Sequence, residues 1–312
     1  MIHADFLSGL ASHLSAHYDF TQVVLQHVTT DGDVHFFTAQ TPDNIYTVRW
    51  LPIGMNSYRL EQSLPAWAVV AQAEASLLPT LLSTCKGALS RVYAFGVCIV
   101  YEVWETDWHL TQMDALAVGR IADLHAVCPR VTIHQETFEL PYADTYLGHL
   151  RDIVGRQFAD PIRQAMRYVL DDQHEAIQFL WRRFRMLEAQ CQWEVDDFVL
   201  THGNPLASLS FSEGQLGFAE GDALMLAPAE RDLWRSLLSD RRAQVVAWYQ
   251  AQMPAYEVNE LACQYYALRD YFVQIDYWVD SVLYASDERV RWHSLDALQN
   301  VFATALPLVA RM

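Results

Sequence analysis

The sequence contains almost no lysine: Lys86 is the only one among 312 residues, and the other basic side chains are arginines. A mechanism that needs two lysines is therefore excluded. Asp and Glu outnumber Lys and Arg by 38 to 21, which gives a formal net charge of −17. Nucleic acid and anionic lipid bind proteins largely through lysine and arginine contacts, so this charge repels both. We expect neither a nucleic-acid nor a membrane partner, whereas a cationic partner is compatible with the charge.

Long hydrophobic runs are also lacking. No apolar run approaches the ~20 residues that span a bilayer, and the longest, such as residues 96–100, have the length of a strand. The first ten residues, MIHADFLSGL, carry an acid and a histidine where a secretory signal has a basic start and a long apolar stretch. We therefore predict a cytoplasmic protein.

Residue pairs typical of metal sites or disulfides are missing as well. The five cysteines are an odd number, lie far apart and form no Cys-x-x-Cys motif. The twelve histidines are scattered, and we identify no His-x-x-x-His pair on a convincing helix face. This pattern favours buried thiols in a reducing compartment over disulfides or zinc ligands.

The first part of the chain, residues 1–103, indicates a small lobe rich in strands. Segments of β-branched and aromatic residues alternate with turn signals, including the Asp-Gly turn of residues 30–33. A helix is expected over residues 60–82, with Pro65 near its first turn. The predicted strands are residues 21–27, 34–39, 45–50, 91–93 and 96–103.

The second part, residues 104–312, is predicted to be a larger and mainly helical lobe. Apolar residues recur at helical spacing, and one short hairpin interrupts the helices at residues 198–218. No repeat and no low-complexity linker separates the two parts. The sequence thus predicts an α+β fold with two lobes in one unit. The expected helical segments are residues 111–125, 146–190 with a break at Pro161, and 230–311.

Three segments resemble a known family. Residues 198–204, FVLTHGN, look like the strand and catalytic loop of the aminoglycoside phosphotransferase and choline kinase family, where His-Gly-Asp is followed by four residues and Asn. Residues 216–234 resemble its metal-binding segment, and APAERDLW within them is close to the spectinomycin-phosphotransferase-like branch. The helix ending in IADLH at His125 is similar to a third family segment. The resemblance covers most of the chain and implies a protein-kinase-like two-lobe fold.

The resemblance places Asn204, next to His202, at the catalytic aspartate position. In the family this Asp orients the acceptor hydroxyl and accepts its proton. An amide accepts a hydrogen bond but cannot take a proton, and general-base help is worth about 10²–10⁴-fold. The family's magnesium-binding Asn corresponds to Leu209, which offers no oxygen ligand. Judged from residue types alone, Gly203-Asn204-Pro205 is also ordinary turn chemistry.

The resemblance assigns the metal position to Glu220 and Asp222, as a weak site, and a phosphate contact to Arg49. Two acids in a loop are, by themselves, more often simply solvated. The usual helix partner of the basic residue is a Glu, and only Glu61 lies near the matching window. The expected phosphate-covering turn, residues 30–33, is not glycine-rich, and its two aspartates would repel a triphosphate. A plain hairpin turn explains it better.

Two further regions are candidate binding surfaces. Glu102 and Trp104 match the hinge strand, where a purine would bond to the backbone; Trp104 either stacks on that ring or is a buried connecting aromatic. In this branch of the family the late helix, residues 264–284, lines the acceptor site. Acids beside aromatics suit an ammonium ligand, although an amphipathic core helix explains the same residues. The candidate substrate residues are Tyr266, Asp270, Asp276 and Trp278.

Because base, metal ligand and phosphate loop are altered together, we predict a catalytically degenerate aminoglycoside phosphotransferase-like protein, a pseudokinase. It would bind a small molecule, with a cation weakly favoured, or a partner protein in the cleft between the lobes. The alternative is an active ATP-dependent phosphotransferase of a small hydroxylated amine, such as an aminoglycoside or a choline-like compound. A scaffold with no ligand is the third option. ATP and Mg²⁺ are the cofactors of the alternative, and the altered positions argue against both.

Overall fold

The computed structural model describes residues 4–104, 106–128, 131–140, 143–212 and 214–311. The chain forms two compact units, each built from three segments. The first contains Met1–Gln135, Phe198–Asp232 and Ala247–Tyr256, and the second contains Glu136–Asp197, Leu233–Val246 and Glu257–Met312. The N-terminal sheet therefore shares a unit with residues 198–232. A lobe boundary at 103/104 stays a prediction.

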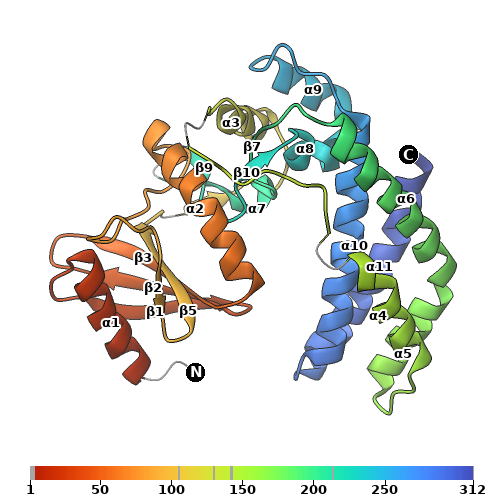
Figure 1. Cartoon of the computed structure of the whole chain (residues 1–312), viewed down its shortest axis with the longest axis horizontal. Coiled ribbons are helices and arrows are strands. Elements are labelled where there is room, and N and C mark those ends of the chain that lie inside the picture. Colours follow the sequence, from red (N-terminus) through yellow and green to blue (C-terminus); the bar gives the residue numbers. More distant parts are fainter. Residues whose placement is uncertain (1–3, 105, 129–130, 141–142, 213, 312) are drawn as a thin grey trace. The chain divides into compact units, whose positions relative to one another are not determined.

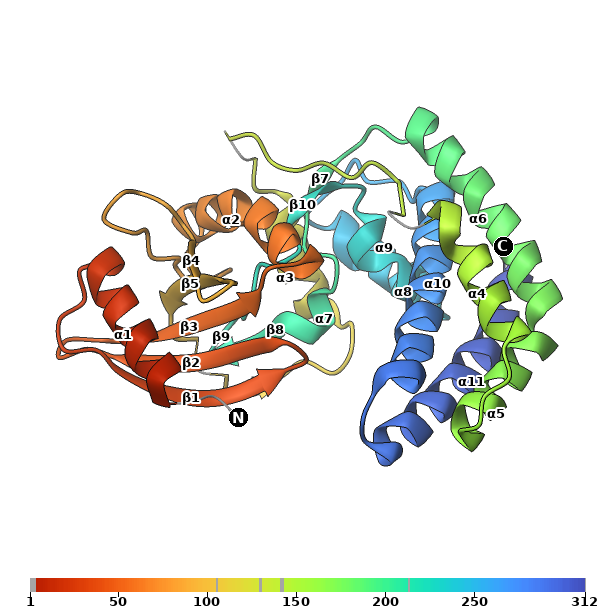
Figure 2. The same ribbon diagram turned by 60° about the horizontal axis from the view of Figure 1, so that its bottom comes forward.

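The first unit contains a five-stranded antiparallel sheet with the order β1-β2-β3-β5-β4 (Figures 1 and 2). β1 and β2 form a hairpin in which Asp31 pairs with Val34, and the turn residue Gly32 has φ +55°. Five strands and this turn lie at the predicted places, but the first strand begins at Val24 and not at residue 21, and it continues to Asp31, four residues beyond its expected end. Their bounds are β1 Val24–Asp31, β2 Val34–Gln40, β3 Ile45–Pro52, β4 Arg91–Tyr93 and β5 Gly96–Glu102.

One helix of this unit, α1 (Ala4–Tyr18), was not predicted. Its apolar residues Leu10, Leu14 and Tyr18 are buried against sheet residues such as Phe37 and Val48, so α1 covers one face of the sheet (Figure 2). This packing explains the helix, because a short helix draws most of its stability from burying an apolar face.

Helix α1 also corrects the interpretation of the histidines. His13 and His17 lie one turn apart on α1, and their ring centroids are 4.4 Å apart. A His-x-x-x-His pair on a helix therefore exists. Within the described residues, however, no group of three or more His, Cys, Asp or Glu side chains is placed to hold a metal ion.

Helix α2 spans Met55–Ala73, so the expected bounds of 60–82 were wrong at both ends. Its start is closed by Ser57, whose hydroxyl accepts the Gly54 N–H at 2.9 Å. Pro65 lies inside the helix and not in its first turn. Beyond α2 a tight turn carries the exposed Lys86, closed by a hydrogen bond from the Thr84 N–H to the Ala88 carbonyl of 2.8 Å.

The rest of the first unit surrounds the His-Gly-Asn motif. β7 pairs with β10, whereas β8 pairs with β9 and with β6. The expected hairpin over 198–218 is therefore only partly right, because the strand before the motif pairs with a later segment. The elements are β6 Trp108–His109, α3 Ala115–His125, β7 Val199–Thr201, α7 Pro205–Ser208, β8 Leu209–Ser212, β9 Gln215–Phe218 and β10 Met225–Ala227.

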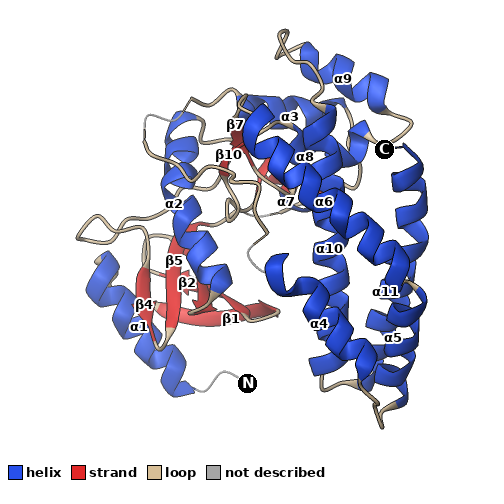
Figure 3. Cartoon of the chain, turned by 45° about the vertical axis from the view of Figure 1, so that its right-hand side comes forward, coloured by secondary structure: helices blue, strands red, loops and turns tan. Residues whose placement is uncertain are grey.

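The second unit is helical (Figure 3). The predicted break at Pro161 is confirmed, since this residue begins α5 and the Asp160 side chain caps it by accepting the Ile162 N–H at 3.0 Å. None of the described helices is long and apolar enough to cross a membrane. The helices of this unit are α4 Ala143–Gly155, α5 Pro161–Asp172, α6 His174–Glu194, α10 Glu260–Tyr284 and α11 Glu288–Arg311. Two others, α8 Glu230–Leu237 and α9 Arg242–Gln250, have residues in both units.

Candidate functional site

The His-Gly-Asn loop joins β7 to the short helix α7 in the first unit. Gly203 has φ +90°, a conformation that strains any residue with a Cβ atom. A Cβ built on Gly203 would lie 2.4 Å from Nη2 of the buried Arg231. The glycine is thus required twice, by the backbone angle and by the close approach of a guanidinium.

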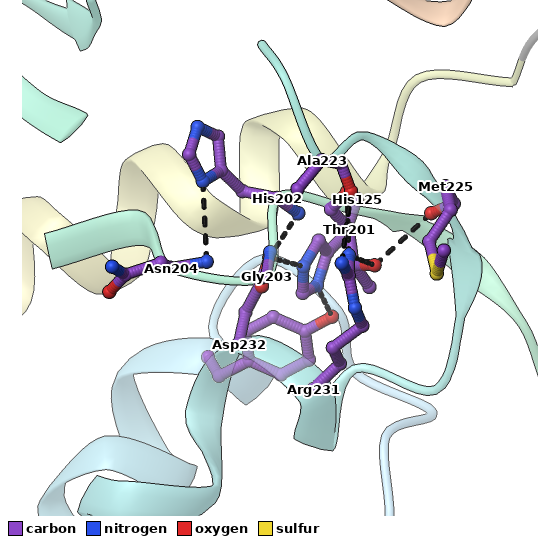
Figure 4. Close-up of polar contacts among 10 residues, drawn as sticks. His125, Thr201, His202, Gly203, Asn204, Ala223, Met225, Arg231 and Asp232 are labelled. Carbon is purple, nitrogen blue, oxygen red and sulfur yellow. Dashed lines mark hydrogen bonds and ion pairs between the residues drawn. The ribbon is translucent and has the colours of Figure 1, made fainter. Parts of the chain in front are cut away.

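A buried carboxylate holds this loop from below (Figure 4). Asp232 accepts the His202 N–H at 2.7 Å and also accepts the Gly203 N–H. His125 donates to the same carboxylate from Nε2 at 3.1 Å, and Nδ1 of His125 lies 2.7 Å from the Tyr249 hydroxyl. Although burial acts to raise the pKa of Asp232, hydrogen bonding to His125 and the nearby Arg231 charge lower it below its ordinary value. The ionised carboxylate therefore fixes two backbone N–H groups of the loop.

His202 is a structural part of the loop. Its ring is buried and stacked on Phe218, with centroids 4.8 Å apart. Nε2 lies 2.8 Å from the Glu220 carbonyl, which can only accept, so this nitrogen carries the proton. Nδ1 in turn accepts the Asn204 N–H at 3.4 Å. Burial lowers the pKa of His202. The neutral ring therefore joins the loop to Glu220, and its proton is already engaged.

Asn204 stands at the end of the loop with its side chain exposed. None of the described residues forms a hydrogen bond with its side-chain amide, and Figure 4 shows the amide pointing away from the Asp232 carboxylate. The predicted catalytic position therefore carries an accessible amide on a firmly held loop, without the basicity of a carboxylate.

Leu209 begins β8 and is completely buried. It pairs with Phe218 in the hairpin, as expected for an extension of its apolar face. The neighbouring hydroxyls are engaged elsewhere: Ser208 accepts the Glu220 N–H at 3.1 Å, and Ser210 accepts the Trp104 indole N–H at 2.9 Å. This position provides no oxygen ligand for a metal.

Arg49 on β3 binds both candidate metal ligands. Its Nη1 lies 3.1 Å from Glu220 Oε2 and also forms an ion pair with Asp222. The Arg49 side chain is only 7% exposed, and its guanidinium lies over the Phe36 ring, 5.3 Å from the centroid. Burial acts to lower the pKa of Arg49, but Asp222 and Glu220 outweigh it and the pKa is raised, so the group is charged. Glu61 is exposed and accepts a hydrogen bond from Ser90 at 3.0 Å.

These residues do not fit a magnesium ion. Mg²⁺ requires near-octahedral oxygen coordination at 2.0–2.1 Å. Here one expected ligand is the alkyl side chain of Leu209, and the two carboxylates already share the Arg49 guanidinium. The sequence and the contacts therefore disagree with the metal that the family resemblance implies.

The two hinge candidates also have protein partners. The backbone N–H of Glu102 donates to the Thr80 carbonyl at 3.0 Å, and its side chain is exposed. Trp104 is half-buried and bonded to Ser210 through its indole N–H. Its ring lies against Gly217, where an added Cβ would come within 2.6 Å of the indole. These contacts favour the connecting role of Trp104 over stacking on a purine.

In the second unit, the candidate substrate residues of α10 have separate surroundings. Tyr266 is buried, and its hydroxyl donates to Glu136 at 3.4 Å. Asp270 pairs with Arg235 at 3.0 Å. Further along, burial and the Asp280 charge raise the pKa of Asp276, and the Trp278 ring meets His293 edge-on at 5.9 Å. A cage of all four stays a prediction.

Two contributors to the loop were not assigned a role from the sequence. Asp232 and His125 both lie in motifs that carry the family resemblance, so a signal was present. Their function became visible only when the fold brought β7, α3 and α8 together.

No family model and no curated protein matches the sequence. Solved structures match along nearly the whole chain. Spectinomycin phosphotransferase APH(9)-Ia, in complex with ADP and spectinomycin, has a TM-score of 0.72 at 15% identity, with 98% of each chain covered. A putative aminoglycoside phosphotransferase from Ralstonia eutropha JMP134 has a TM-score of 0.61 at 13% identity, with 97% of each chain covered. A microcompartment-associated aminopropanol kinase has a TM-score of 0.61 at 11% identity, with 96% of this chain and 97% of that chain covered. The likeness to aminoglycoside phosphotransferases and their kinase-like α+β fold is thereby confirmed, whereas residue roles are not transferred at such identities.

Proposed function

We propose that the chain is a catalytically degenerate phosphotransferase-like protein that binds a small molecule at the His-Gly-Asn loop. One observation carries this proposal: the loop is fully held by Asp232, His125 and His202, yet the side chain that it presents is the amide of Asn204. The support for this loop is retained, while the group that would accept a proton is replaced.

The expected loss of rate is large. Loss of general-base help costs about 10²–10⁴-fold. Phosphoryl transfer depends mainly on positioning and on charge stabilisation by metal ions and basic groups, and Leu209 removes one metal ligand in addition. The two changes act on different parts of the same reaction, so we expect turnover close to the uncatalysed background.

The charges around the loop favour a neutral or cationic ligand. Arg49, Glu220 and Asp222 together sum to −1, within a chain of net charge −17. A polyanionic nucleotide is repelled there unless a metal ion accompanies it. We therefore propose an amine-bearing small molecule as the ligand class. Spectinomycin phosphotransferase APH(9)-Ia, which has a similar fold, was solved in complex with ADP and spectinomycin.

Restoring the replaced side chains tests the proposal. We would measure phosphate transfer from labelled ATP with Mg²⁺ to spectinomycin and to simple amino alcohols, using wild type, Asn204→Asp and Asn204→Asp/Leu209→Asn. Wild type should remain at background, and Asn204→Asp should exceed it by at least about tenfold. This is less than the gain of about 10²–10⁴-fold from a full general base, because Leu209 still leaves the metal position incomplete in the single variant.

The matched control is Leu209→Asn alone, which places an amide in a fully buried position. Its melting temperature separates loss of fold from loss of chemistry. If wild type transfers phosphate well above background and as fast as the double variant, the protein is an active enzyme and the proposal is wrong.

An active ATP-dependent phosphotransferase of a small hydroxylated amine is the second candidate. Asp222 and the 98% coverage by a spectinomycin phosphotransferase structure favour it. A rise in melting temperature with ATP that needs Mg²⁺ would support this candidate. A rise with amines but not with nucleotide would support the degenerate binder, and no rise with any small molecule would favour a scaffold.

A further inference from the structure

We propose that Arg49 is a built-in cation that takes the place of a divalent metal between Glu220 and Asp222. The site would then bind its ligand without a divalent ion. That the ligand binds near this site rests on the proposed function. That Arg49 replaces the metal is argued from the contacts of Arg49 alone.

A single nitrogen makes the bridge. Nη1 of Arg49 lies 3.1 Å from Glu220 Oε2 and contacts Asp222 Oδ2 as well. An ion that bridged the same two oxygens would have to occupy the space of this nitrogen. The carboxylates are 37% and 28% exposed, whereas the Arg49 side chain is 7% exposed, so the cation lies on the protected side of the pair.

The surroundings hold Arg49 in this position. β3 places it in the sheet opposite Ile99 of β5, and the Phe36 ring covers one face of the guanidinium. Glu61, the nearest acid to the expected partner position on α2, bonds to Ser90 and makes no described contact with Arg49. The two carboxylates of the 220–222 loop are therefore the acidic partners of Arg49 among the described residues.

The loop that supplies the carboxylates is fixed independently of any metal. The Glu220 backbone is held by Ser208 through its N–H and by His202 through its carbonyl. An added Cβ on Gly221 would lie 2.8 Å from the buried Trp67 ring. Glu220 and Asp222 are thus presented at a rigid turn, and a weakly bound ion is not needed to order it.

Mn²⁺ binding tests this role without an activity assay. Mn²⁺ would be titrated into wild type, Arg49→Met, Arg49→Lys and Arg49→Met/Asp222→Asn, with free Mn²⁺ followed by its electron paramagnetic resonance signal. Wild type and Arg49→Lys keep a cation between the carboxylates and should show no saturable site. Arg49→Met should gain one saturable site with a Kd of about 10⁻⁴–10⁻³ M, the range of weak oxygen-ligand calcium sites. The added Asp222→Asn change should abolish it.

A wild-type protein that binds one Mn²⁺ as tightly as Arg49→Met would overturn the proposal, and so would an Arg49→Met variant that folds and gains no site. If Arg49→Met does not fold, the melting temperature of wild type in Mg²⁺, compared with NaCl of equal ionic strength, still decides. A saturable rise in melting temperature with Mg²⁺ that is lost in Asp222→Asn would contradict the proposal that Arg49 occupies the place of the metal. The Mn²⁺ titration and the phosphate-transfer assay test separate proposals. If wild type transfers phosphate but has no Mn²⁺ site, the degenerate function is wrong and the proposed role of Arg49 still stands.

Discussion

Replacing Asp232 with alanine is expected to destabilise the first unit strongly. The carboxylate accepts two backbone N–H groups, from His202 and Gly203, and a third hydrogen bond from His125. Asp232 is 5% exposed, so water cannot simply replace it. An unsatisfied buried donor costs about 1–3 kcal/mol, so the two N–H groups cost about 2–6 kcal/mol. We expect a loss of about 3–5 kcal/mol, which is also the cost of removing one partner of a buried charged pair.

Thermal unfolding followed by tryptophan fluorescence measures this change. At 2–4 °C per kcal/mol for a unit of this size, the melting temperature should fall by about 6–20 °C. Asp123→Ala is the matched control. Asp123 is 42% exposed and pairs with Arg120 in an i,i+3 ion pair, which is worth about 0–1 kcal/mol.

Equal melting temperatures for Asp232→Ala and Asp123→Ala would refute the assignment. The loop N–H groups would then be solvated or otherwise bonded in solution, and the frame beneath Asn204 would not exist as described. A loss confined to Asp232→Ala, with Asp232→Asn in between, would support it, since the amide oxygen can still accept one of the bonds.

Two further changes test the loop. Gly203→Ala must accept φ +90° and a contact of 2.4 Å with Arg231. We therefore expect the free energy of unfolding to fall by about 1–3 kcal/mol or more, measured by thermal unfolding. The control Gly148→Ala, in open space on α4, should be neutral or stabilising. Burial lowers the pKa of His202, so the unfolded state takes up a proton below about pH 6.5 while the folded state does not. Stability should therefore be complete above about pH 6.5 and fall as the pH drops towards the lowered folded-state pKa, by at most about 1.4 kcal/mol per pH unit. His13 and His35, whose pKa values are also lowered by burial, contribute with the same sign. His202→Gln should reduce this slope in denaturant unfolding at a series of pH values but not abolish it, and an unchanged slope would contradict a neutral His202.

The sheet and most helices could be predicted because their patterns are local. In β1 to β3, segments of β-branched and aromatic residues alternate with clear turn signals, and Pro161 marks the start of α5. Helix α1 was missed although Leu7, Leu10, Leu14 and Tyr18 recur at helical spacing, because that segment was considered only as a possible targeting signal. The bounds of α2 were wrong because Pro65 was taken as a start signal, while the helix continues through it.

The candidate site could be predicted only where a motif marked it. The motif correctly predicted that Leu209 extends the apolar face of the hairpin, whereas Asn204 lies not in a simple turn but immediately before the short helix α7. The pairing of Arg49 with Glu220 joins residues 171 positions apart, and no spacing rule reaches that far. The charges of these residues did not predict the ion pair. An acidic side chain in a loop can be solvated or paired, and only the fold determines which.

Lys86 is the one side chain of the sequence that carries a primary amine. It is exposed on the turn closed by Thr84 and Ala88. An amine-reactive dye or crosslinker therefore modifies one known side chain in the first unit and leaves the arginine-based ion pairs untouched. A fluorophore can be attached there without any cysteine having to be removed.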